Sequence, residues 1–153
     1  MTSAGRSPGF WVVVVFLAVS IVLMLIGQTV GVFNYDVAAS MGLQEKPEEM
    51  TDFGVQVNRA FGAADTVVYV PLMLLSLVGL ILRKRWSLLI TAAFFGASAY
   101  WTATVTFMLL FLPGVAGYSN VPGPEIWLFI GTYMVVGVVG LLYIVWRGEE
   151  LLR

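Results

Sequence analysis

Four long apolar runs constrain this chain more than any other feature. They cover residues 10–33, 62–83, 86–112 and 126–146, and each is long enough to cross a bilayer as a helix. Because the hydrocarbon contains no water, the backbone of each run must satisfy its own hydrogen bonds, which a helix does. With 59% hydrophobic and only 11% charged residues, the chain is far more apolar than a soluble domain. The sequence therefore predicts an all-α integral membrane protein, with a single four-helix transmembrane domain over residues 1–153 and its helices packed as a bundle.

The basic residues are strongly biased toward one end of the predicted bundle. Six of the eight lie between the second and third runs or near the two chain ends, and seven of the nine acidic residues lie at the opposite end. Loops rich in lysine and arginine stay on the cytoplasmic side of a membrane. We therefore expect a multi-pass protein of the cell membrane with both termini in the cytoplasm and an acidic outer face. The six are Arg6, Arg83, Lys84, Arg85, Arg147 and Arg153, and the other two are Lys46 and Arg59.

Two missing residue types narrow the chemistry. The sequence has no cysteine and no histidine, which excludes disulfides, thiolate nucleophiles, iron–sulfur ligation and the usual haem ligands. A metal would have to be a hard cation held by carboxylates and carbonyls. We expect no resident cofactor and no metal site, and the net charge of −1 favours no nucleic-acid partner.

The two connections on the outer side hold most of the remaining polar residues. The first contains the charged segment QEKPEE at 44–49, followed by TDFGVQVNRAF at 51–61. That second segment predicts a short amphipathic helix in the first outer loop, capped by Thr51 or Asp52. The second connection, 113–125, is rich in glycine and proline and offers Tyr118, Asn120 and Glu125. Any chemistry should gather at this outer end.

Asp65 is the most informative single residue in the sequence. The 18 residues from Asp65 to Arg83 would span about 27 Å as a helix, which places Asp65 near the outer membrane boundary. There it could cap the second helix, pair with Arg59, or act as a functional carboxylate beside other acids. Pro71 removes a backbone donor and could kink the helix below it. The catalytic candidates are Asp65, Asp36, Asp52 and Glu125.

Polar residues also mark a candidate ligand site. Ser98, Thr102 and Thr106 recur every four residues and share one face of the third helix. Their hydroxyls could bond back to their own helix or line a cavity. Glycines at 27, 31, 137 and 140 indicate close helix packing or a dimer seam. The ligand-binding candidates are Arg59, Asn34, Gln28, Tyr69, Tyr100, Thr102 and Thr106.

Three functions remain open at this point. The favoured one is an accessory or interaction subunit that docks a membrane partner through its acidic outer face, with a homodimer through the glycine seam as a further possibility. The first alternative is a protein that binds a lipid-like ligand, or a membrane-edge enzyme, with Asp65 as acid or base and Arg59 holding an anionic headgroup. The second alternative is a passive pore lined by the hydroxyls of the third helix. Because no charged residue lies at mid-membrane depth, coupled ion transport is disfavoured.

The absence of native cysteine makes the predicted orientation easy to test. A single cysteine placed by Glu48→Cys should react with a membrane-impermeant maleimide added outside intact cells. One placed by Lys84→Cys should react only after the membrane is opened, because the basic turn is expected in the cytoplasm. Labelling of both positions from the same side would contradict the orientation.

Overall fold

The computed structural model describes residues 6–153, and these residues are almost entirely helical, with no strand among them. Four continuous helical stretches, Pro8–Phe33, Asp52–Ile81, Trp86–Phe111 and Pro124–Leu152, are long and apolar enough to cross a membrane. The first stretch consists of α1 (Pro8–Met24), a π-helical turn (Leu25–Thr29) and α2 (Val30–Phe33), and the second of α4 (Asp52–Ala64), another π-helical turn (Asp65–Tyr69) and α5 (Val70–Ile81). The third stretch is α6 (Trp86–Phe111), and the fourth is α7 (Pro124–Arg147) followed by a 3₁₀ turn (Gly148–Leu152). The first connection adds α3 (Tyr35–Ser40) and a 3₁₀ turn (Pro47–Glu49).

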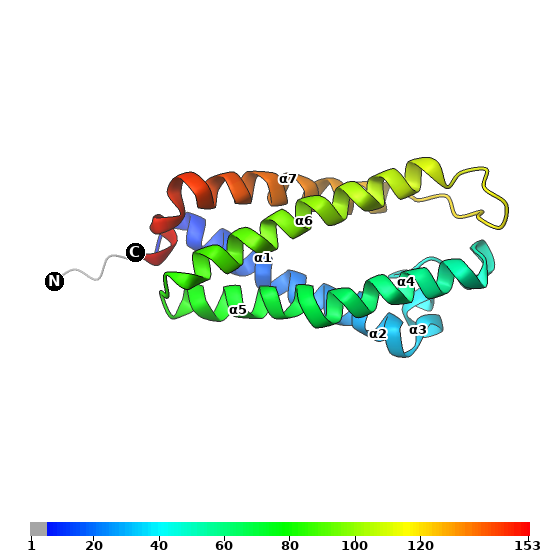
Figure 1. The fold of residues 1–153 in the computed structure, drawn as a ribbon, viewed down its shortest axis with the longest axis horizontal. Helices are drawn as coiled ribbons and strands as arrows, with labels where there is room; N and C mark the ends of the chain where they lie inside the picture. Colours follow the sequence, from blue (N-terminus) through cyan, green and yellow to red (C-terminus); the bar gives the residue numbers. More distant parts are fainter. Residues whose placement is uncertain (1–5) are drawn as a thin grey trace.

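The long helices lie alongside one another (Figure 1). α6 packs against both α7 and α5, and α5 packs against α1. One end of the molecule carries the α5–α6 turn together with both ends of the described chain, while α3 and the 112–123 loop lie at the other end. The Arg6 guanidinium donates to the carbonyls of Leu80 and Ile81, so the start of α1 is fixed to the end of α5.

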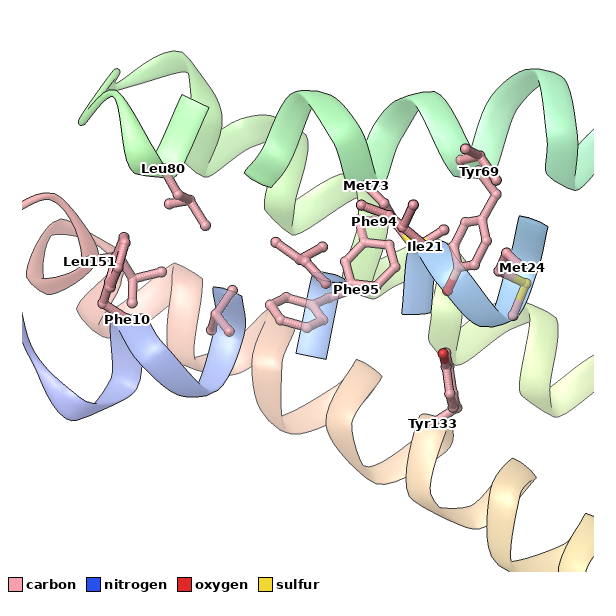
Figure 2. Close-up of a cluster of buried hydrophobic side chains, with 13 residues drawn as sticks. Phe10, Ile21, Met24, Tyr69, Met73, Leu80, Phe94, Phe95, Tyr133 and Leu151 are labelled. Carbon is pink, nitrogen blue, oxygen red and sulfur yellow. The ribbon is translucent and has the colours of Figure 1, made fainter. Parts of the chain in front are cut away.

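The core is built from side chains of all four long helices (Figure 2). Its largest fully buried members are Phe10, Leu17, Met73, Phe94 and Phe95. The outer surfaces are apolar as well. Leu89, Leu128 and Val67 are 76%, 73% and 71% exposed, which suits helices surrounded by lipid and would be costly in water.

Two glycines of α7 allow the closest helix approach. A Cβ at Gly137 would lie 2.8 Å from the Ala99 amide nitrogen and 3.1 Å from the Phe95 carbonyl oxygen, and one at Gly140 would meet the Phe95 ring. α6 and α7 therefore meet almost backbone to backbone, as small residues permit in membrane helices. Here the glycines serve packing within the chain. In contrast, nothing lies within 4 Å of a Cβ at Gly96 or Gly131.

The second long helix begins earlier than the sequence suggested. The amphipathic segment expected as a separate helix is present from Asp52, but it continues without a break through Asp65 into α5. Thr51 is its N-cap, because its hydroxyl accepts a bond from the Gly54 amide at 3.3 Å. Residues 52–61 are too polar for a membrane core, so the sequence predicted a membrane-crossing helix only from residue 62. The backbone is nevertheless helical from Asp52 onward.

Candidate functional site

The two π-helical turns pack against each other where the first and second long helices cross. The hydroxyls of Thr29 and Thr66 are hydrogen-bonded at 2.9 Å, and the Thr66 hydroxyl lies 2.7 Å from the Gly62 carbonyl oxygen that accepts from it. A Cβ at Gly62 would lie 3.0 Å from the Gln28 carbonyl oxygen, so only glycine fits without displacement. π-helical turns are rare and often occur at functional sites, and here two of them meet.

Asp65 begins the second of these turns and is buried, with 8% of its surface exposed. Its Oδ2 atom has no hydrogen-bond partner among the described residues. The turn itself has a local cause, because the ring of Pro71 clashes with the carbonyl four residues earlier in a regular helix. That carbonyl belongs to Val67, inside the turn. The irregular backbone thus fits the proline, and it leaves a carboxyl group buried without a partner.

The helix-cap interpretation of Asp65 is therefore wrong. Asp65 has helical backbone angles, and its amide donates to carbonyls of α4, so there is no free helix start for it to cap. Arg59 does not pair with Asp65 either, since none of the ion pairs in residues 6–153 includes Arg59 or Asp65. Instead the Arg59 guanidinium donates to the Val32 carbonyl oxygen at 2.9 and 3.2 Å, which closes the C-terminal end of α2.

The carboxylate of Glu45 joins the two outer connections. Its Oε2 accepts from the Asn58 amide of α4 at 2.6 Å, and its Oε1 accepts from the Tyr118 hydroxyl at 2.9 Å and the Asn120 amide at 3.0 Å. Asn58 also donates to the Tyr35 hydroxyl at 3.0 Å. Residues from α3, α4 and both loops are thereby linked through one half-buried acid. Burial raises the pKa of Tyr118 to about 12, with the negative charges of Glu45 and Glu49 adding to the effect, so this phenol remains a donor at neutral pH.

Beside this network lies an open cavity of about 420 Å³, the outer cavity. Its walls are apolar and come mainly from α6 and α7, with Trp101, Met108 and Phe129 among them. Its polar rim is defined by Glu45, Asn58, Asn120 and Glu125. A concave apolar space with a few convergent polar groups is the usual form of a small-molecule site, and its volume lies within the ordinary range of roughly 300–1,000 Å³.

The hydroxyls of Ser98, Thr102 and Thr106, called the hydroxyl stripe of α6, donate hydrogen bonds to backbone carbonyls of their own helix. Ser98 donates to Phe94, Thr102 to Ser98 and Thr106 to Thr102, each through the carbonyl one turn earlier. Ser98 and Thr102 are fully buried. The Tyr69 hydroxyl, which points into the space between helices in Figure 2, meets Ser98 Oγ at 2.5 Å. The stripe therefore contributes to packing, and it presents no continuous polar surface.

The remaining sequence candidates are dispersed. Gln28 and Glu125 line the outer cavity, whereas Asp36 and Asp52 are exposed in the first turns of α3 and α4. Outside the cavity, the Asn34 side chain caps α3, and Tyr100 is 75% exposed on the outer surface. Within residues 6–153 no group of three or more Asp, Glu, His or Cys side chains is placed to hold a metal ion.

Sequence reasoning did not identify Glu45, Asn58 and Trp101 as site residues. Glu45 lies in a charged loop that resembles ordinary solvated chain, and Trp101 lies in an apolar run. Their convergence depends on contacts between residues distant in sequence, such as the 75 positions between Glu45 and Asn120. The amide side chains of the first connection, together with Asn120 in the second, were the one available signal.

No protein-family model, no curated protein and no solved structure matches the chain. The function of the outer end therefore has to follow from its own residues and their geometry.

Burial of an unpartnered carboxyl at position 65 predicts an unusual response to substitution. Asp65→Asn should raise the midpoint of thermal unfolding, by an amount equivalent to about 1 kcal/mol or more, because it removes a charge that has lost its hydration. The matched control Asp52→Asn should lower it slightly, by about 0.3–1 kcal/mol, since an exposed acid in the first turn favours a helix. Tryptophan fluorescence of the purified protein in detergent measures both. A larger loss for Asp65→Asn than for Asp52→Asn would mean that the carboxylate makes a stabilising contact.

Proposed function

We propose that this chain is a multi-pass protein of the cell membrane, with both termini in the cytoplasm and its long helices in a transmembrane bundle, that binds a lipid-like molecule in the outer cavity. The proposal rests on one observation, the cavity of about 420 Å³ with apolar walls and a polar rim. In the proposed orientation the rim faces the outer aqueous side, and the walls lie at the depth of the outer leaflet. An amphiphile would place its head at the rim and its tail against α6 and α7.

The cavity suits a preformed binding site because contacts within the protein order both its loop side and its helix side. Glu45 fixes the loop side through Asn58, Tyr118 and Asn120. On the helix side, aromatic contacts join Trp101, Phe129 and Tyr133, with the Phe129 and Tyr133 ring centroids 4.7 Å apart. A site that is already ordered loses less conformational freedom when a ligand binds, which favours affinity.

Binding without catalysis is the part of the proposal that the residue positions support. Of the four catalytic candidates, only Glu125 lines the cavity, and Asp65 is not part of its lining. A general acid and a general base must both reach the reacting group. Because the candidates do not converge on this cavity, we assign no reaction to it. The hydroxyls of α6 are engaged with their own helix, so a pore is not part of the proposal.

A second candidate, an accessory subunit that docks a partner or forms a homodimer, is favoured by a separate observation. Asp36, Glu48 and Asp52 are exposed at the outer end, and within residues 6–153 no ion pair includes them. Such a surface would attract a partner with a basic face. Under this proposal, gentle detergent extraction should yield a complex larger than one chain. A monomer under every mild condition would contradict it.

Native mass spectrometry of the protein from mild membrane extracts tests the binding proposal. We expect a bound amphiphile that remains attached at low collision energy. Val105→Trp should remove it, because Val105 lines the cavity and the added indole would occupy the space of the tail. Leu110→Trp is the matched control, since Leu110 lies on the same helix, is 57% exposed and does not line the cavity.

Two outcomes would contradict the binding proposal. One is the absence of any adduct on the native chain. The other is an adduct that survives Val105→Trp at the same occupancy while thermal unfolding shows a folded variant. Met108→Trp provides a second filled cavity, from another turn of α6, if the first variant does not fold.

A further inference from the structure

The charges around the outer cavity are unevenly balanced. Three carboxylates line it, from Glu45, Glu49 and Glu125, against the single cation Lys46. Lys46 lies 3.9 Å from the Glu49 carboxylate, so those two residues offset each other. The other outer cation, Arg59, does not line the cavity and donates to the Val32 carbonyl. Glu45 and Glu125 therefore remain as negative charges without a cation among the described residues.

Glu45 differs from an ordinary surface acid because of the groups that hold it. Asn58, Tyr118 and Asn120 all donate to its carboxylate, and all three donors are neutral. They fix the position of the carboxylate, but they add no positive charge. Partial burial also weakens solvent screening of that charge. The result is a preorganised negative charge at the rim of an apolar cavity.

The ionisation of the neighbouring phenols is consistent with this negative field. Burial raises the pKa of Tyr35, and the charge of Glu45 raises it further. Burial likewise raises the pKa of Tyr118, and the negative charges of Glu45 and Glu49 raise it further. Both phenols thus remain uncharged at neutral pH and add no negative charge of their own to that of the carboxylates. An anionic head placed at the rim would meet like charge, while a cationic head would find two carboxylates.

We infer that the outer cavity selects amphiphiles with a cationic head, such as a primary alkylammonium, which pairs with Glu45 and Glu125 while its tail lies against Trp101 and Phe129. This inference rests on the proposed binding function and adds the chemical class of the ligand. Charge complementarity and shape give the same orientation, with the head at the loops and the tail between α6 and α7. The aromatic walls also suit the methylene groups next to an ammonium.

Three probes with the same twelve-carbon tail test this selection: dodecylammonium, dodecanol and dodecanoate. Binding is measured by tryptophan fluorescence of the full chain in nanodiscs of zwitterionic lipid, and each titration is corrected by the same nanodiscs without protein. We expect dodecylammonium to bind about tenfold or more tightly than dodecanol, because hydrogen bonds to charged groups are strong. Dodecanoate should bind most weakly, and the preference should shrink as salt is raised.

Charge-neutralising variants identify the groups responsible. Glu125→Gln should reduce the preference for dodecylammonium over dodecanol, and Glu45→Gln should reduce it further. Glu125 is exposed and takes part in no hydrogen bond that ties the loops together, so its variant keeps the test valid if Glu45→Gln fails to fold. The control Glu48→Gln changes an exposed acid of the same segment outside the cavity and should leave the preference intact.

The outcomes separate the two proposals. Equal binding of dodecylammonium and dodecanol, removed in both cases by Val105→Trp, would overturn the charge selection and leave the binding function standing. Tightest binding of dodecanoate would overturn the selection as well. If Glu48→Gln removes the preference for dodecylammonium as fully as Glu125→Gln does, the preference comes from the general surface charge. That result would overturn the selection by the cavity. Binding of none of the probes by the folded protein would count against the proposed function itself.

Discussion

The carboxylate of Glu45 is the interaction on which the outer end of this molecule depends. Glu45 belongs to the α3–α4 connection, and its carboxylate accepts hydrogen bonds from α4 and from the 112–123 loop. Without it, no other side chain of the described chain would join Asn58 to Asn120. A second link, from the Ser119 amide to the Glu49 carbonyl at 2.8 Å, fastens the same two segments at one further point. Residues of both segments line the outer cavity together with α6 and α7.

Helices long and apolar enough to cross a bilayer have to satisfy their polar groups internally, and much of the remaining polar structure fits this constraint. The hydroxyls of α6 use their own backbone, the π-helical turns meet through two threonines, and Arg59 closes the end of α2. Most buried side-chain polar groups of the described residues are satisfied within the protein, as hydrocarbon surroundings would require, with the Ser76 hydroxyl as one exception. Asp65 is the other exception, and the only ionisable one among them. A buried carboxyl without a partner is costly, and sites that keep such groups often trade stability for function, although the outer cavity does not reach this one.

Much of the architecture was predictable from the sequence, because hydrophobic length alone identifies membrane-crossing helices. The four long apolar helices follow from the four runs. The continuity of α4 into α5 did not, since a helix whose outer third is polar gives no continuous apolar signal. The hydrogen-bond partner of Arg59 was not predictable either, because it is a backbone carbonyl that no sequence pattern marks.

The candidate site was predictable only in part. Gln28 and Glu125 were selected from the sequence and do line the outer cavity. Thr102 and Thr106 were selected for their spacing, but hydroxyl spacing alone does not distinguish a lining residue from one that bonds to its own helix. The place of Glu45 in the site could not be predicted without knowing which loops face each other. That arrangement depends on long-range contacts between α6, α7 and the first connection.

Photolabelling tests the central claim most directly, because it reports where an amphiphile lies. An alkylammonium probe with a diazirine on its tail can be activated in membranes that contain the native protein, and the modified peptides can be identified by mass spectrometry. The binding account predicts labels concentrated on cavity residues such as Met108 and Phe129, reduced by excess dodecylammonium. Labels spread evenly over lipid-facing residues such as Leu89 and Leu128, and unchanged by the competitor, would contradict it.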